Sequence, residues 1–302
     1  MSLPEEEVTL AETLKKHGYA TANYGKAHLR KDPRTYGFDE AIVGWVRSYY
    51  HPFSPQYSKT LPSRKGDYYT DKLTDAALDF IERNRDRPFF VHLEHFAVHD
   101  PIQGRKDLVD KYRKKQAGMP KQDGPEYILE PNPDGPSLSA EELKRLEKND
   151  ALELHQEKRV WWVKQRQDNV EFAGMLEATD ESLGRIRAKL EELGLTENTI
   201  VIYSSDQGFY LGEHGWYDKR WMFEESFKMP FIIRWPGVIK PGSRTKALIQ
   251  NIDYGPTFLN ICGADVPGDM QGRSIVPLLE KSGEKPDNWR EALYYAYYGE
   301  RT

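Results

Sequence analysis

Apolar and polar positions along the chain follow one order three times: an amphipathic helix, a β-forming run and then a polar loop. The apolar positions of each helix recur about every 3.6 residues, and each following run contains alternating, aromatic or β-branched side chains. The three units lie within 8–29, 67–101 and 170–206. This alternation, without a solenoid-type repeat, predicts an α/β fold with a mostly parallel sheet flanked by helices.

Each unit places its strand directly after its helix. The first helix has Leu10 and Leu14 at helical spacing and ends at His17-Gly18, a pair that suits a helix C-cap. The strand-forming runs after the three helices are 19–25, 88–95 and 200–206, and a further run lies at 229–237. The third helix is predicted to carry one apolar stripe, made of Leu176, Leu183, Ile186, Leu190 and Leu193.

The stretch near 103–160 interrupts this pattern, because it is proline-rich and heavily charged. We expect it to be an excursion from the core that contains one short helix, with Ser139 as the N-cap and Glu142 as its partner. The predicted organisation is one α/β domain over 1–285 that carries this insertion. The start of a smaller C-terminal subdomain is predicted over 286–302.

The composition limits the class of protein. The chain has 302 residues, of which 38% are hydrophobic and 12% aromatic, so it can bury a sizeable core. Its formal charge of -5 gives no basic field that would favour nucleic acid or an anionic membrane surface. No apolar stretch approaches the roughly 20 residues needed to cross a bilayer. We therefore expect neither a nucleic-acid partner nor a membrane span.

Polar side chains follow the strand-forming runs. They are Lys26 and His28 after the first run, His99 after the second, and Asp206, Gln207, His214 and Lys219 after the third. The carboxyl ends of parallel strands meet at one edge of a sheet, where α/β proteins bind their ligands. We therefore treat these residues as one candidate site.

The chemistry of these residues suits a metal ion and an anion. Asp206 and Gln207 offer a carboxylate and an amide oxygen on one turn, which favours Ca²⁺ or Mg²⁺ over zinc. Gly208 would let the backbone leave such a site sharply. The lysines and histidines could neutralise a tetrahedral oxyanion, and a histidine could protonate its leaving oxygen. From the residues alone, a simple turn at 206–208 and surface roles for Lys26 and His28 remain open.

Taken together, these segments resemble the sulfatase family. The segment TLAETLKKHGYATANYGKAHL resembles the family's helix and strand that lead to Gly-Lys-Trp-His-Leu. The segment TENTIVIYSSDQGFYLGEHGWYDK resembles its Ser-Asp-Asn/His/Gln-Gly motif with the following Gly-Glu-His-Gly and lysine. The segments 67–102 and 229–279 are similar to the family as well, so the resemblance covers nearly the whole chain apart from the insertion.

The resemblance implies an alkaline-phosphatase-like α/β fold and the hydrolysis of sulfate esters. Asp206 and Gln207 would be metal ligands, normally for Ca²⁺, although Gln207 replaces the commoner asparagine. Lys26 and Lys219 would bind sulfate oxygens or the nucleophile. These roles follow from the family's motifs and not from the spacing of the residues.

The resemblance also assigns roles to three histidines. His28 would assist turnover of the covalent intermediate, and His99 would lie near the leaving oxygen. His214 is a substrate-side candidate. Ala27 stands where the family has the tryptophan of Gly-Lys-Trp-His, and this departure leaves the two functional side chains beside it in place. His17, His92 and His95 have no supporting motif, so we interpret them as packing or surface residues.

One family feature is missing from the sequence. Sulfatases begin with a strand that ends in paired aspartates and then a Cys/Ser-X-Pro-X-Arg motif, whose Cys or Ser becomes the formylglycine nucleophile. Neither feature occurs here, and Cys262, the only cysteine, lacks Pro and Arg at the required spacing. We interpret Cys262 as a small buried hydrophobe. We therefore expect a chain that is truncated at its N-terminus, lacks the nucleophile and is inactive alone.

Two other functions stay open. One is a phosphodiesterase or phosphonate monoester hydrolase of the same superfamily, because phosphate and sulfate require similar cationic groups. The other is a non-catalytic protein that binds sulfated glycans, in which Trp216 and Trp221 stack against a sugar. The expected partner is a sulfated small molecule or glycan, and an exposed strand edge would favour self-association. The resemblance is compatible with a periplasmic or extracellular location.

Overall fold

The computed structural model of the chain describes residues 3–4, 7–45, 47–51, 53–55, 61–120, 123–124, 127–131, 139–142, 144, 160–164, 168–219 and 221–296. It divides into two compact units. The first unit is made of Met1–Lys114, Val170–Val201 and Ile233–Leu293, and the second of Lys115–Asn169, Ile202–Ile232 and Tyr294–Thr302. Among the residues described, no helix is long and apolar enough to cross a membrane.

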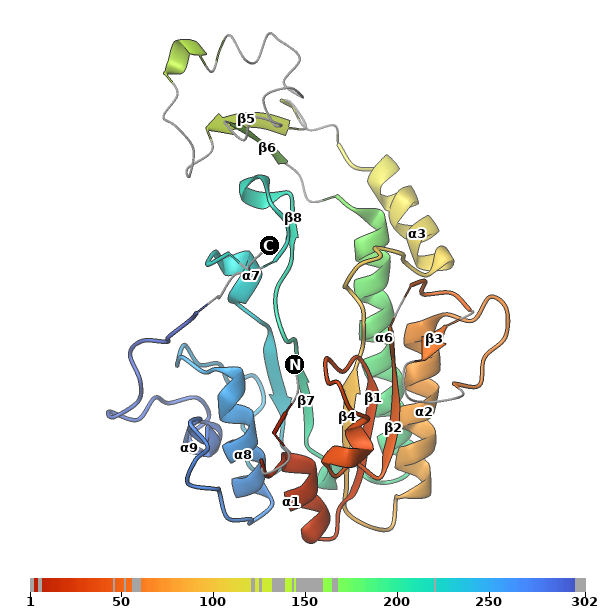
Figure 1. Ribbon diagram of the computed structural model, residues 1–302, viewed down its shortest axis with the longest axis vertical. Helices are drawn as coiled ribbons and strands as arrows, with labels where there is room; N and C mark the ends of the chain where they lie inside the picture. Colours follow the sequence, from red (N-terminus) through yellow and green to blue (C-terminus); the bar gives the residue numbers. More distant parts are fainter. Residues whose placement is uncertain are drawn as a thin grey trace. The chain divides into compact units, whose positions relative to one another are not determined.

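A four-stranded sheet forms the centre of the first unit, in the order β3-β2-β1-β4 (Figure 1). Its strands are β1 (Ala20–Gly25), β2 (Glu40–Trp45), β3 (Ser54–Pro55) and β4 (Phe89–Glu94). β1 pairs in parallel with β2 and β4, and only the short β3 is antiparallel. Gly25 lies opposite Glu94, so β1 and β4 end at the same edge. The predicted mostly parallel sheet flanked by helices is confirmed.

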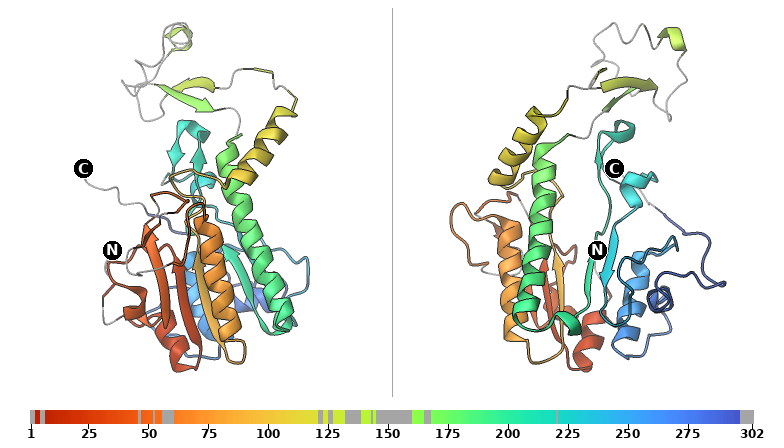
Figure 2. Two further views of the ribbon diagram at one scale, coloured as in Figure 1. Left: turned by 90° about the vertical axis from the view of Figure 1, so that its right-hand side faces the viewer. Right: turned by 180° about the vertical axis from the view of Figure 1, so that it is seen from behind.

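Helices cover both faces of this sheet. Those that begin in the first unit are α1 (Leu10–Lys16), η1 (Pro33–Tyr36), α2 (Tyr69–Arg83), α3 (Lys106–Ala117), α6 (Val170–Glu192), η2 (Thr196–Asn198), η4 (Asn251–Asp253), α8 (Tyr254–Ile261) and α9 (Val276–Glu280). α2 and α6 run side by side on one face (Figure 2). On the other face, Phe90 of β4 packs against Phe258 of α8, with ring centroids 6.1 Å apart. Alternate side chains of β4 therefore face different layers.

The main core lies between the sheet and these two helices. Ala22 and Tyr24 of β1 are buried there with Leu73 and Phe80 of α2 and Met175 of α6. The Tyr24 ring meets the Phe80 ring edge-on, with centroids 6.2 Å apart. Each large apolar side chain buried in this way contributes about 1.5–3 kcal/mol. Packing on this face fixes where the strands end and thus where the polar residues beyond them begin.

The buried face of α6 differs from the predicted leucine stripe. Leu176 is 48% exposed, whereas Leu190 is buried as expected. The buried positions of the helix are Gly174, Met175, Ala178, Thr179, Ser182 and Leu190. Small side chains let α2 approach closely, and the hydroxyls of Thr74 and Ser182 hydrogen-bond at 2.7 Å. Apolar periodicity marked the largest side chains, but small residues make the contact between the helices.

Local signals set several element ends correctly. α1 begins with a capping box in which Thr9 and Glu12 bond reciprocally, and its C-cap is His17. The helical residues 140–142 of the insertion are capped as predicted, because the Ser139 hydroxyl accepts from the Glu142 N–H at 3.2 Å and the Ser139 N–H donates to the Glu142 carboxylate at 2.8 Å. β2 was not predicted from the sequence. Nor was the pairing of β5 (Tyr127–Pro131) with β6 (Val160–Lys164) inside the insertion.

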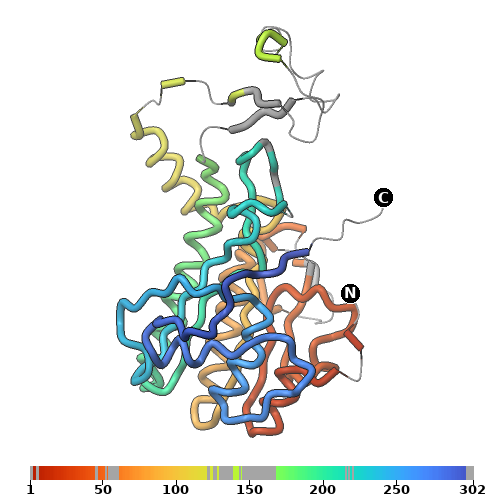
Figure 3. The backbone as a smooth tube through the Cα atoms, turned by 90° about the vertical axis from the view of Figure 1, so that its left-hand side faces the viewer, coloured from red at the N-terminus to blue at the C-terminus, as the bar shows by residue number. Residues whose placement is uncertain are grey.

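The remaining elements of the second unit are short. They are β8 (Tyr210–Leu211), η3 (Glu213–Gly215), β9 (Tyr217–Asp218) and α7 (Glu224–Phe227), and β8 pairs with β9 in antiparallel fashion. β7 (Val201–Ser204) pairs with β10 (Phe231–Arg234), and the boundary between the units falls within these two strands. After β10 the chain returns to the first unit through 235–293, which carries α8 and α9 (Figure 3).

Candidate active site

Lys26 follows the last residue of β1 and is fixed to the end of β4. Its backbone N–H donates to the carbonyl of Glu94 at 2.9 Å. The preceding Gly25 has a φ of 117°, and a Cβ there would lie 1.8 Å from the same carbonyl oxygen. Only glycine fits this approach. The Lys26 ammonium lies 5.8 Å from the centroid of the Phe96 ring, within cation–π range. His28 is exposed two residues further on.

His99 packs against the same phenyl ring. Its imidazole meets the Phe96 ring edge-on at 6.3 Å, and its backbone N–H donates to the Phe96 carbonyl at 2.7 Å. Its Nδ1 lies 3.1 Å from the carbonyl oxygen of Asp100. A carbonyl only accepts, so Nδ1 carries the proton and Nε2 is the acceptor in the neutral ring. Once protonated, Nε2 becomes a donor, as a general acid requires. Phe96 thus joins two of the predicted residues, Lys26 and His99.

A polar cluster on β1 and β4 was missed from the sequence. Nδ1 of His92 lies 2.8 Å from the Glu94 carboxylate, and the Asn23 amide nitrogen lies 3.1 Å from that carboxylate. Burial lowers the pKa of His92, but the Glu94 carboxylate outweighs this effect and raises it overall. His92 lies opposite Asn23 in the parallel register, and its spacing from Glu94 puts both on one face. The i, i+2 spacing of His92 and Glu94 was the sequence signal from which this cluster could have been predicted.

The His95 side chain points toward the layer that contains α6. Its Nε2 lies 2.9 Å from the Ser182 hydroxyl. Its Nδ1 is buried and has no hydrogen-bond partner within the described part of the chain. Burial lowers the pKa of His95 to about 4, so the ring is neutral at physiological pH. Its interpretation as a packing residue agrees with this environment.

In the second unit, Asp206 and Gln207 follow the end of β7, with Ser205 between them and the strand. The Ser205 hydroxyl donates to the Gln207 carbonyl at 2.7 Å, and the Gly208 N–H donates to the Ser226 carbonyl at 2.7 Å. A Cβ on Gly208 would lie 1.9 Å from the carbonyl oxygen of Glu225. Gly208 is therefore needed for this close approach and not for a left-handed turn. Its expected role in letting the backbone leave the site sharply stays a prediction.

His214 is held from two sides. It adopts a left-handed backbone conformation with a φ of 55°. Its ring stacks on Phe223 with centroids 4.0 Å apart and planes 12° apart, and its Nε2 lies 3.3 Å from the Glu225 carboxylate. Because Glu225 accepts, Nε2 of His214 is the donor in this contact.

Lys219 lies a few residues further along the same segment. Its ammonium is 3.2 Å from the Asp218 carboxylate, and its side chain is 17% exposed. Asp218 has a φ of 74°, so this segment contains a second non-glycine residue in the left-handed region. Such conformations cost about 1–3 kcal/mol each and cluster at functional sites.

The predicted site residues therefore fall into two groups. The ends of β1 and β4 carry Lys26, His28 and His99 in the first unit, whereas Asp206, Gln207, His214 and Lys219 belong to the second. The described residues contain no group of three or more His, Cys, Asp or Glu that could hold a metal ion. Ca²⁺ takes 6–8 oxygen ligands, roughly. Asp206 and Gln207 have the right donor atoms, but they do not complete a calcium site by themselves.

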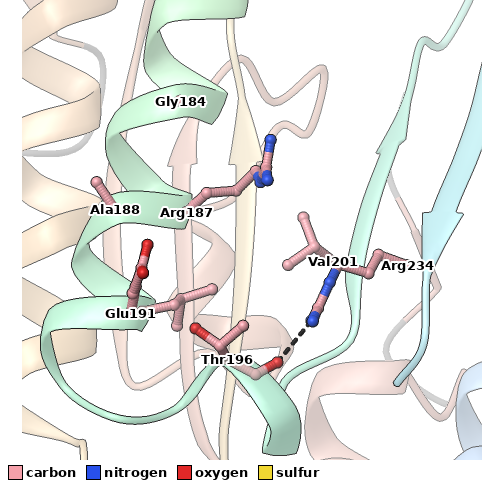
Figure 4. Close-up of a pocket in the computed structure, with 8 residues that line it drawn as sticks. Gly184, Arg187, Ala188, Glu191, Thr196, Val201 and Arg234 are labelled. Carbon is pink, nitrogen blue, oxygen red and sulfur yellow. Dashed lines mark hydrogen bonds between the residues drawn. The ribbon is translucent and has the colours of Figure 1, made fainter. Parts of the chain in front are cut away.

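A pocket of about 270 Å³ lies elsewhere in the first unit, between the C-terminal part of α6 and the start of β7 (Figure 4). The Arg234 guanidinium donates to the Thr196 carbonyl there at 2.5 Å. The pocket is lined by Gly184, Arg187, Ala188, Leu190, Glu191, Thr196, Val201 and Arg234, and by none of the predicted site residues.

Cys262 is half-buried, and burial raises the pKa of its thiol. The protonated thiol is a poor nucleophile, which agrees with its interpretation as a packing residue.

The known proteins that are similar to this chain include several sulfatases. Residues 212–301 match the family described as N-sulphoglucosamine sulphohydrolase, C-terminal. The N-acetylglucosamine-6-O-sulfatase of Bacteroides thetaiotaomicron is 33% identical over 340 residues, which cover 97% of this chain and 60% of that relative. The extracellular sulfatase SULF-1 homolog of Drosophila melanogaster is 28% identical, over 98% of this chain and 26% of its own length. The chain thus spans less than two thirds of each of these two relatives.

One solved structure is also similar to this chain in its three-dimensional fold. It is a complex of a protein with its substrate D-glucosamine-2-N,6-O-disulfate, and it superposes with a TM-score of 0.75 at 29% identity. The match covers 100% of this chain and 70% of that one. The strand-end motifs, the parallel sheet and these relatives agree. The chain belongs to the sulfatase family and has its alkaline-phosphatase-like fold.

Proposed function

We propose that this chain forms part of a hydrolase of sulfate esters and that its substrate is a sulfated sugar. The observation that carries the proposal is the placement of Lys26 at the carboxyl edge of the sheet, where its N–H is bonded to Glu94 and its ammonium lies against Phe96. The N-acetylglucosamine-6-O-sulfatase and the disulfated-glucosamine complex support a sulfated amino sugar as the substrate class.

The candidate residues would neutralise negative charge on the sulfate group and transfer protons. Lys26 and Lys219 would neutralise sulfate oxygens, because an ammonium close to an oxyanion in a water-poor site stabilises developing charge. His99 would protonate the leaving oxygen from Nε2, with Nδ1 held by the Asp100 carbonyl. His28 would assist turnover of the intermediate. Attack on sulfur is assigned to no residue here, because the sequence has no Cys/Ser-X-Pro-X-Arg motif and the Cys262 thiol is protonated.

Asp206 and Gln207 are proposed to contribute to a Ca²⁺ site, with Mg²⁺ as the alternative. Their oxygens suit a hard cation, which would supply positive charge to the bound sulfate. Further ligands would have to come from outside this pair.

An exported location, periplasmic or extracellular, is part of the same proposal. It is supported by the relative whose name describes it as extracellular.

The test is a parallel assay of the whole protein that contains this chain. Sulfate release from glucosamine 6-sulfate should exceed hydrolysis of a phosphate diester or a phosphonate monoester, and Lys26→Met should abolish most of it. Faster turnover of the phosphorus ester would contradict the proposed substrate class. Binding of sulfated glycans without any turnover would favour the non-catalytic alternative.

A further inference from the structure

The second unit exposes three consecutive apolar side chains. Trp221 is 43% exposed, Met222 70% and Phe223 40%. Single exposed apolar residues are ordinary, but a contiguous apolar surface marks a binding site more often than chance. These three side chains follow Lys219 closely in the sequence, and Lys219 is the residue proposed to bind sulfate.

A buried tyrosine fixes this surface. Tyr210 is fully buried, and its hydroxyl donates to the Trp221 carbonyl at 3.0 Å. Its ring meets His214 and Phe223 edge-on, at 6.4 and 6.5 Å. Burial raises the pKa of Tyr210, so the hydroxyl remains protonated and continues to donate. One side chain therefore anchors both ends of the exposed segment.

Trp221 is supported from one side. The Trp216 ring lies 4.5 Å from the Trp221 ring, with the planes 35° apart. This contact restricts the Trp221 indole while leaving 43% of the residue exposed. A restricted aromatic surface binds at a low entropy cost, since fewer rotamers are lost when a ligand stacks on it.

His214 adds a polar group to this aromatic surface. Its left-handed backbone, with a φ of 55°, is a strained conformation of the kind that clusters at ligand sites. Phe223 holds the face of the ring and Glu225 holds Nε2. Nδ1 makes no hydrogen bond within the part of the chain that the structure describes, so it can accept one from a ligand.

We infer that Trp221 and His214 form a subsite for the sugar ring of the substrate. The apolar C–H face of a pyranose would stack on the Trp221 indole, and a ring hydroxyl would donate to Nδ1 of His214. Tyr210, Trp216, Phe223 and Glu225 act as positioning residues. The inference rests on the proposed function, in which Lys219 takes the sulfate group, and it assigns recognition of the sugar to a separate set of side chains.

Calorimetric titration of the full chain with D-glucosamine-2-N,6-O-disulfate and with inorganic sulfate tests this inference. Trp221→Ala should weaken binding of the sugar about tenfold and leave binding of sulfate unchanged. Trp221→Phe keeps an aromatic face and should restore most of the affinity. Met119→Ala, which alters another exposed apolar residue of the second unit, should change neither. Circular dichroism would confirm that each variant is folded.

The outcomes separate this inference from the proposed function. If the wild-type chain binds sulfate but holds the sugar no more tightly, the sugar subsite is wrong and the anion site stands. If Trp221→Ala binds the sugar as tightly as the wild type, the subsite is likewise wrong. Lys219→Met should weaken both probes, and unchanged binding of sulfate in that variant would count against the anion site alone.

Discussion

Gly208 lies directly against the backbone of Glu225, because a Cβ on Gly208 would lie 1.9 Å from the Glu225 carbonyl oxygen. The Gly208 N–H also donates to the next carbonyl, that of Ser226, at 2.7 Å. The turn that carries Asp206 and Gln207 is therefore pressed against the segment whose Glu225 side chain holds His214. Two groups of candidate residues that are separate in sequence therefore share one backbone contact.

Gly208→Ala should therefore disturb both groups. The new methyl group cannot fit without moving the backbone, so we expect a loss of about 1–3 kcal/mol in the free energy of unfolding, measured by denaturant titration. Gly184→Ala is the matched control, because nothing lies within 4 Å of its Cβ position and it is an exposed helical residue. That control should be neutral or stabilising by up to about 1 kcal/mol. Equal stabilities of the two variants would contradict the contact.

Gly25→Ala should destabilise the first unit. The substitution combines a φ of 117° with a Cβ that would lie 1.8 Å from the Glu94 carbonyl oxygen. Gly18→Ala separates these effects, since Gly18 has a φ of 83° and open space around its Cβ position. Strain alone should cost about 1–2 kcal/mol at Gly18, and the clash should make the loss at Gly25 larger. Thermal unfolding of both variants measures the difference, and an equal loss at the two positions would rule out the clash.

His95 should make the stability depend on pH. Burial lowers its pKa to about 4 from an ordinary value of 6.5, so the unfolded chain binds this proton more readily than the folded chain. Its contribution is fully present above about pH 6.5 and is lost as the pH falls toward about 4. The slope should reach at most about 1.4 kcal/mol per pH unit.

The control for this pH effect is His95→Gln. Comparison with this variant isolates His95 from His92, whose raised pKa acts in the opposite direction. Urea titrations of both proteins across this range measure the effect. Parallel pH profiles for the wild type and the variant would show that His95 does not contribute.

The edge of the sheet should favour association. β4 is the last strand in the order β3-β2-β1-β4, so within the described residues it pairs with β1 alone. Exposed strand edges bind other strands. We therefore expect sedimentation velocity to show dimers or larger species that increase with protein concentration. A single monomeric species at all concentrations would contradict this expectation.

The sequence predicted the parts of the fold that depend on local signals. The first helix has its C-cap at His17, β4 lies within the apolar run 88–95, and the Ser139 cap forms as expected. It did not predict β2 or the pairing of β5 with β6, because their short strands carry little periodicity of their own. It also placed Leu176 on the buried face of α6, where close packing of small residues decided the contact instead.

The sequence indicated which residue types make up the candidate site, but it did not indicate the contacts that hold them. The family resemblance selected Lys26, His99 and Lys219, yet no pattern along the chain indicates that Phe96 lies against both Lys26 and His99. The contacts of His214 with Phe223 and Glu225 could not be predicted either, because they depend on how a loop folds back on itself. Contacts of this kind are set by tertiary packing, which sequence spacing does not encode.

The most direct measurement is a calorimetric comparison of glucosamine 6-sulfate with unsulfated glucosamine, titrated into the full chain. If Lys26 and Lys219 recognise the sulfate group, the sulfated sugar should bind at least about tenfold more tightly, a difference of about 1.4 kcal/mol. Lys26→Met and Lys219→Met should each remove most of that difference. Equal affinity for the two sugars, or an unchanged difference in both variants, would contradict the account.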